Sequence, residues 1–113
     1  MLAATRCRVP PGDAEDFLAD AQTLLGVLAE QPGYVTGSVA RAVDDPTLWL
    51  VSTRWADVGA YRRALGAYDV KVVATPLLSR ALAEPSAYEI LAGDGAGPPN
   101  RPEPRRLDDP LDR

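Results

Sequence analysis

The sequence predicts one α+β domain whose elements follow the order strand, helix, strand, strand, helix, strand. Two segments have apolar residues at helical spacing, and short β-prone segments lie on either side of them. Proline and glycine pairs mark the boundaries between these segments. With 113 residues, of which 46% are hydrophobic and 25% charged, the chain has the composition of a globular domain with one modest core.

The first helix is the clearest element of the pattern. Apolar side chains recur at three- and four-residue spacing from Ala14 to Leu28, and they form one stripe for the core. Asp13 is positioned to cap the helix, and Pro32-Gly33 ends it. The preceding residues, Leu2 to Val9, stop at the turn Pro10-Pro11-Gly12 and predict the first strand.

A β-hairpin is predicted next, and it carries the argument for a partner. Its arms run from Tyr34 to Val43 and from Leu48 to Trp55, with the turn at Asp44-Asp45-Pro46-Thr47. One face of the second arm holds Trp49, Val51, Thr53 and Trp55, and the other holds Leu48, Leu50, Ser52 and Arg54. Apolar residues on both faces predict burial on both sides, so we expect a homodimer.

The second half of the chain completes the order of elements. Asp57 is expected to cap a helix that includes Tyr61 and Leu65, and Pro76 is expected to kink or break the helical segment that follows. Ser86 to Leu91 alternates like a last short strand. This order is that of the split βαβ, ferredoxin-like fold.

The composition changes after residue 92, where we place the end of the domain. Residues 93–113 are rich in glycine, proline and charge, which predicts a flexible C-terminal tail. An arm that lies across the partner subunit is the alternative for this segment.

Charge and residue counts exclude several classes of function. A net charge of -4 provides no basic surface for nucleic acid or an anionic membrane. The chain has no histidine, and its single cysteine, Cys7, rules out an internal disulfide and is expected in the core. No apolar run reaches the length of a membrane span. We therefore expect a cytoplasmic protein with no metal or other cofactor.

Residues 32–91 resemble the antibiotic biosynthesis monooxygenase domain family. The similar motifs are Pro32-Gly33-Tyr34 at the start of the second strand, Thr53-Arg54-Trp55 at the end of the third, and Val58-Gly59-Ala60-Tyr61-Arg62 in the helix that follows. The resemblance implies a dimeric α/β barrel with a pocket between sheet and helices in each subunit. It also implies oxidation of aromatic polyketide-like molecules by molecular oxygen without flavin, haem or metal.

The resemblance assigns site residues. Quinone-forming members have a tryptophan at the end of the third strand and a tyrosine six residues later, which match Trp55 and Tyr61. Those enzymes have an asparagine four residues before the tryptophan, where this chain has Val51. The haem-degrading branch uses a histidine that this chain lacks.

Each candidate residue has a functional and a structural interpretation. Trp55 could stack on an aromatic ligand or fill the core, and Tyr61 could donate to a developing oxyanion or reach water. The predicted substrate-binding residues are Tyr34, Val51, Arg62 and Tyr68, which could equally be core or surface residues. The sequence thus predicts a cofactor-independent monooxygenase acting on a hydrophobic aromatic molecule. The alternative, favoured by Val51, is a non-catalytic homodimeric binding or interaction domain.

Overall fold

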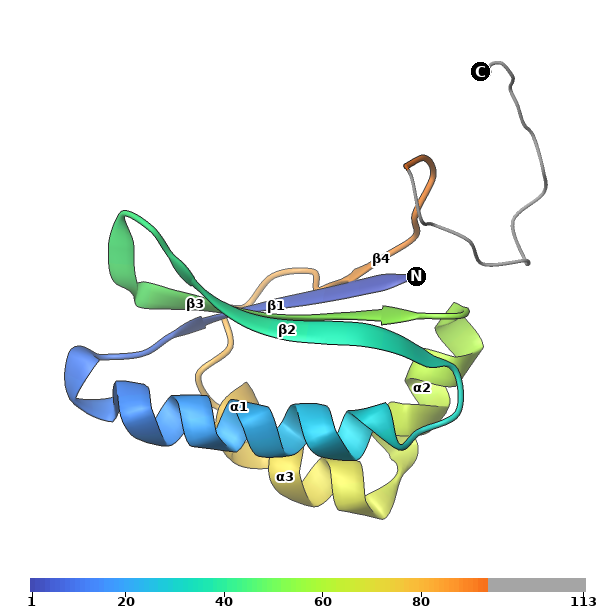
Figure 1. The fold of residues 1–113 in the computed structure, drawn as a ribbon, viewed down its shortest axis with the longest axis horizontal. Helices are drawn as coiled ribbons and strands as arrows, with labels where there is room; N and C mark the ends of the chain where they lie inside the picture. The colour runs from blue at the N-terminus through green and yellow to red at the C-terminus, as the bar shows by residue number, and fades with distance from the viewer. Residues whose placement is uncertain (94–113) are drawn as a thin grey trace.

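The computed structural model describes residues 1–93, which form a four-stranded antiparallel sheet with three helices on one face (Figure 1). The strands are β1 (Leu2–Arg8), β2 (Tyr34–Ala42), β3 (Asp45–Trp55) and β4 (Ala87–Tyr88). The helices are α1 (Ala14–Ala29), α2 (Val58–Gly66) and α3 (Tyr68–Leu78), and a 3₁₀ turn, η1 (Pro11–Asp13), precedes α1. The strand order β2-β3-β1-β4 confirms the ferredoxin-like fold class. The predicted tail lies outside the described residues except for Gly93, so the boundary at residue 92 stays a prediction.

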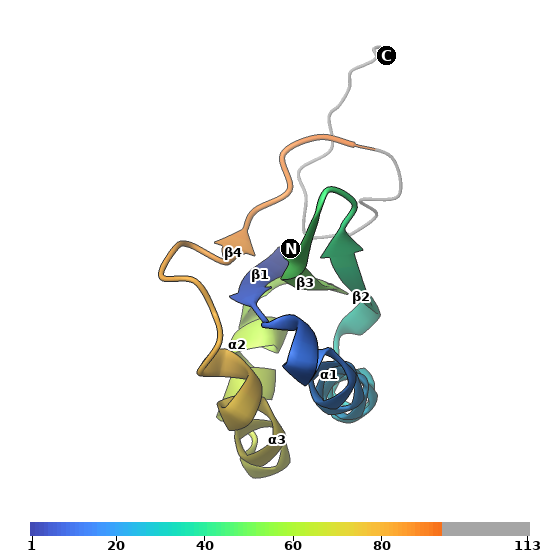
Figure 2. The same ribbon diagram turned by 90° about the vertical axis from the view of Figure 1, so that its left-hand side faces the viewer.

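The alternation of β3 separates the two faces of the sheet as predicted. Strand β1 pairs with β3 from Leu2 opposite Arg54 to Arg8 opposite Leu48. The inward residues of β3 are buried, namely Trp49, Val51, Thr53 and Trp55. The outward residues are only partly covered, namely Leu48, Leu50, Ser52 and Arg54. All three helices lie on the inward side, as Figure 2 shows. No described helix covers the outward face.

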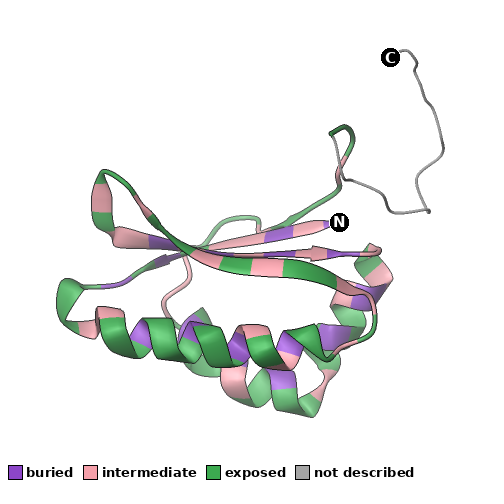
Figure 3. Ribbon diagram, viewed as in Figure 1, coloured by how far each residue is buried: buried purple, intermediate pink, exposed green. Residues whose placement is uncertain are grey.

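The core lies between this inward face and the helices. Helix α1 contributes Phe17, Ala21, Leu24 and Leu28, and α3 contributes Val70, Ala74 and Leu77. Figure 3 shows these buried positions on the sides of the helices that face the sheet. Cys7 is fully buried among them, and burial raises the pKa of its thiol, which fits the predicted core role.

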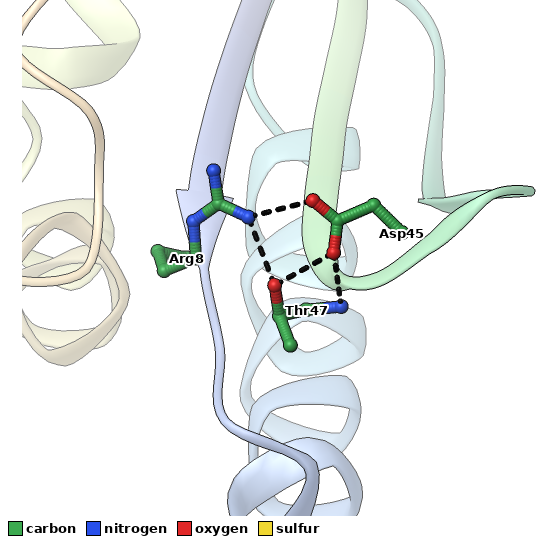
Figure 4. A network of polar contacts seen from close by, with 3 residues as sticks. All are labelled: Arg8, Asp45 and Thr47. Carbon is green, nitrogen blue, oxygen red and sulfur yellow. Dashed lines mark hydrogen bonds and ion pairs between the residues drawn. The ribbon is translucent and has the colours of Figure 1, made fainter.

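The hairpin turn differs from the prediction. Val43 and Asp44 form the turn, and β3 already begins at Asp45. The Asp45 carboxylate accepts hydrogen bonds from the Thr47 amide (3.1 Å), the Thr47 hydroxyl (2.8 Å) and Arg8 Nη1 (2.9 Å), as drawn in Figure 4. Bonds to Thr47 and then to Arg8 lower the pKa of Asp45. Strand β3 begins at Asp45 because Asp45 pairs with Ala42 of β2, and Arg8 adds a contact from β1.

The two aspartates predicted to cap helices differ in their actual roles. Asp57 has an extended backbone and accepts a hydrogen bond from the Ala60 amide at 2.8 Å, so this prediction is confirmed. The Asp13 prediction is wrong, because this residue ends the 3₁₀ turn with φ -103° and ψ 3°, a conformation unlike the extended one of a capping residue. Its carboxylate instead accepts from Arg80 Nη2 at 2.9 Å.

Two predictions about the second half also need correction. Pro76 does not break α3, which continues to Leu78, so the missing amide costs this helix one hydrogen bond close to its end; a kink at Pro76 stays a prediction. The last strand contains only Ala87–Tyr88 rather than residues 86–91. The chain from Arg80 to Ser86 already runs along β1, where Leu82 donates to the Arg6 carbonyl at 2.9 Å.

Candidate functional site

Three of the predicted site residues form one aromatic cluster at the end of β3. Tyr34, the first residue of β2, lies edge-on to Trp55 with ring centroids 5.4 Å apart. Tyr61, in the first turns of α2, lies on the same indole with centroids 5.9 Å apart. The cluster therefore joins the β2–β3 pair to α2.

Trp55 is the centre of the cluster and is closed to solvent. Its side chain is 1% exposed, and its indole N–H donates to the Thr53 hydroxyl at 2.8 Å. Thr53 precedes it by two residues on the same strand face and is also buried. The indole donor is thus already used, and Trp55 can act on its surroundings only through its ring.

Tyr61 has the hydroxyl group of the cluster that is best suited to take part in a reaction. Burial raises the pKa of this phenol, and a hydrogen bond with the Ser86 side chain opposes part of the rise. The Ser86 carbonyl accepts from the Ala4 amide at 2.7 Å, so this serine is held against β1. A phenol with a raised pKa stays protonated at neutral pH and remains a hydrogen-bond donor.

The Tyr34 phenol can lie over Gly37 of its own strand, β2, because this glycine has no side chain. A Cβ atom at Gly37 would lie 2.5 Å from the Tyr34 hydroxyl oxygen and 2.9 Å from Leu25 of α1. The missing side chain leaves room for the phenol between β2 and α1. Gly37 is a residue that the motif comparison did not single out.

The other three predicted residues lie outside this cluster. Val51 is buried on the inward face of β3 between Thr5 and Val39, about 13 Å along the strand from Trp55. Arg62 is exposed on α2, and Tyr68 is 79% exposed at the start of α3. Substrate contacts of these residues remain predictions.

Sequence reasoning also missed Thr53 and Trp49. A pattern in the sequence could have identified both residues, because Thr-x-Trp occurs twice on β3, as Thr47-Leu48-Trp49 and as Thr53-Arg54-Trp55. In the second copy the threonine accepts from the tryptophan, whereas Trp49 Nε1 is buried and has no hydrogen-bond partner among residues 1–93.

Comparison with known proteins identifies the family. The family model described as antibiotic biosynthesis monooxygenase matches residues 1–74, about two thirds of the chain, from β1 into α3. The chain belongs to this family. No curated protein sequence matches the chain.

Solved structures from several organisms have a similar fold. SnoaB, a cofactor-independent oxygenase from Streptomyces nogalater, is 26% identical with a TM-score of 0.66, over 81% of this chain and 96% of SnoaB. A conserved protein from Methanosarcina mazei is 19% identical with a TM-score of 0.64, over 76% and 84% of the two chains. A Pseudomonas aeruginosa protein is 15% identical with a TM-score of 0.61, over 79% and 92%.

The described part of the chain has no cluster of three or more potential metal-binding His, Cys, Asp or Glu side chains. Residues 1–93 also contain no helix that combines the length and apolar character of a membrane span.

Proposed function

We propose that this protein is a cofactor-independent monooxygenase that acts on a hydrophobic, polyketide-like aromatic molecule. The observation that carries the proposal is Tyr61, a half-buried phenol on α2 that contacts the buried Trp55. Family membership and the likeness to an oxygenase that needs no cofactor support the same conclusion.

The proposed reaction converts an anthrone-type CH₂ group to a quinone carbonyl. The substrate loses a C–H proton to form an enolate, which supplies the electrons that reduce molecular oxygen. One oxygen atom enters the product as C=O, and the other leaves as water with the two hydrogens of the CH₂ group. The enzyme's contribution is to stabilise the enolate oxygen and to exclude bulk water.

Tyr61 is the residue that donates to the enolate oxygen in this proposal. Trp55 holds the phenol ring through its indole face and edge, and Tyr34 supports Trp55 from the opposite strand. Val51 gives an apolar surface on β3, and Arg62 and Tyr68 are proposed to contact substrate from the surface of the helices.

We also propose that the protein is a homodimer formed through the outward face of the sheet. Leu2 and Ala4 of β1 and Leu48 and Leu50 of β3 give this face an apolar centre. The ion pairs Arg6–Glu84 and Arg8–Asp45 flank it. A sheet with helices on one side leaves such a face to water unless a second copy covers it.

Oxygen uptake with anthrone as substrate tests the catalytic proposal. We expect uptake above the buffer rate and formation of anthraquinone. Tyr61→Phe should lower kcat about a hundredfold, because it removes one donor to a developing oxyanion. Tyr88→Phe is the matched control, since this exposed tyrosine donates to the Pro85 carbonyl away from the cluster. Equal rates for the wild type and the Tyr61 variant would remove the catalytic role of Tyr61.

A non-catalytic, homodimeric binding or interaction domain is the second candidate. Two observations favour it: Val51 stands where the resemblance implies an asparagine, and the Trp55 indole donor is already bound to Thr53. This function predicts saturable binding of planar aromatic molecules with no oxygen uptake above buffer.

A further inference from the structure

The two Thr-x-Trp tripeptides of β3 have different hydrogen-bonding partners. Thr53 accepts from the Trp55 indole at 2.8 Å. The equivalent hydroxyl before Trp49 is engaged elsewhere, since Thr47 Oγ1 donates to Asp45 at 2.8 Å and accepts from Arg8 Nη1 at 2.8 Å (Figure 4). No described group accepts from the Trp49 indole as Thr53 accepts from that of Trp55.

Trp49 is buried in spite of its unpaired donor. Its side chain is 6% exposed, and its Nε1 atom has no partner among the described residues. Buried polar atoms in native proteins nearly always have a partner, because the bond to water lost on burial must be replaced. An acceptor from outside residues 1–93, such as a bound molecule or an internal water, would replace that bond.

The groups around Trp49 indicate the kind of molecule. Phe17 of α1 lies edge-on to the indole with ring centroids 5.3 Å apart. The Arg41 guanidinium lies over the ring, with Cζ 5.4 Å from its centroid, and Arg41 is exposed. No ion pair of Arg41 occurs within the described part of the chain. Aromatic rings, an N–H donor and a cation without an anionic partner are together suited to an aromatic anion.

We propose that Trp49, Phe17 and Arg41 form a second binding site, which takes a planar aromatic molecule bearing a carboxylate or phenolate oxygen. The Trp49 indole N–H donates to this oxygen, and Arg41 swings off the ring to pair with the same group. The ligand ring then takes the place that the guanidinium leaves over the indole, while the buried Phe17 supports the indole from the core. The site lies near the middle of β3, about 20 Å along the strand from Trp55. It is therefore independent of the proposed role of Tyr61.

Binding of 2-naphthoate to the full chain tests the site, with naphthalene as the analogue without an acceptor. In ¹H–¹⁵N spectra the two indole N–H resonances belong to Trp49 and Trp55, and single Trp→Phe variants assign them. We expect 2-naphthoate to move the Trp49 resonance and to leave that of Trp55 in place. Naphthalene should move the Trp49 resonance far less, because it offers no oxygen.

Titration calorimetry on variants measures how much each residue contributes to the affinity for 2-naphthoate. Trp49→Phe and Arg41→Gln should each weaken 2-naphthoate binding about 10- to 100-fold, the loss of a hydrogen bond to a charged group. Arg63→Gln, a control for loss of an exposed arginine, should not change it. An unmoved Trp49 resonance in the wild type, or wild-type affinity in Trp49→Phe, would overturn the site and assign the indole N–H to an internal water. The spectrum of the wild type decides even where a variant fails to fold, and oxygen uptake by the Tyr61 site is measured separately.

Discussion

A single hydroxyl group at Tyr61 shows how the environment of one residue sets its chemistry. The phenol is withdrawn from water on α2, and this burial raises its pKa more than the Ser86 hydrogen bond lowers it. A neutral phenol can donate a hydrogen bond to an enolate, whereas a phenolate would repel it. The same burial that fits Tyr61 to the core therefore fits it to the proposed reaction.

The raised pKa of Tyr61 predicts a pH dependence of stability. The folded state holds the phenolic proton more tightly than the unfolded state, whose tyrosine pKa is about 10. The contribution to the free energy of unfolding is complete below that unfolded pKa and is lost as pH rises through it towards the folded pKa. Urea unfolding at pH 8 to 11 should show a steeper loss above about pH 10 in the wild type than in Tyr61→Phe. The three other tyrosines are common to both proteins, so identical slopes would mean that Tyr61 has an ordinary pKa.

At the scale of elements, the turn between α1 and β2 brings the aromatic cluster together. Gly33 has φ 90°, and its carbonyl accepts from the Ala56 amide at 2.8 Å. A Cβ atom there would collide with the Ala60 side chain of α2. One residue therefore directs the chain into Tyr34 and lets α2 approach closely enough for Tyr61 to contact Trp55.

Substitution of this glycine should destabilise the fold. Gly33→Ala combines a left-handed backbone with a steric clash, and we expect a loss of about 1–3 kcal/mol in the free energy of unfolding. Gly26→Ala is the matched control, because this glycine lies inside α1 and a Cβ atom added to it would meet nothing within 4 Å. It should stabilise the protein by about 0.5–1 kcal/mol through its helix propensity. Denaturant unfolding measures both, and a Gly33 variant as stable as the wild type would contradict the role of the turn.

At the scale of the whole molecule, the sheet is asymmetric: one face carries three helices and the other carries none of those described. The outward side chains of β1 and β3 are partly apolar, and the arginines among them are paired near the rim of the sheet. Burial of this face in a dimer would remove apolar surface from water, the dominant favourable term in association.

A charge at the centre of the outward face should separate the proposed dimer. Leu50→Glu places a carboxylate on the face that a second copy would cover. Its cross-strand neighbour Arg6 is already paired with Glu84, so burial would take an additional charge out of water. Sedimentation velocity should give two chains for the wild type and one for this variant. Val72→Glu, which adds the same charge at an exposed apolar position on α3, should remain a dimer. A wild type that sediments as one chain at micromolar concentration would exclude the dimer.

Local pattern predicted much of the fold because each signal depended on residues close together in the sequence. The stripe of α1, the two faces of β3 and the cap at Asp57 all follow from spacings of two to four residues. The resemblance placed Trp55 and Tyr61 correctly on adjacent elements. Two predictions that failed concern turns: Asp13 ends a 3₁₀ turn and pairs with Arg80, and the β2–β3 ladder already begins with Ala42 opposite Asp45.

The sequence by itself determined the order of the elements, the inward face of β3 and the tripeptide that occurs twice on it. Only the tertiary structure decided which tryptophan keeps a free indole donor. The physical reason is that folding sets which groups meet: Thr53 accepts from Trp55, whereas Thr47 bonds to Asp45 and to Arg8, 39 residues away, and Trp49 Nε1 has no partner among residues 1–93. Hydrogen-bond partners are chosen among groups that folding brings together, and their identity cannot be obtained from spacing along one strand.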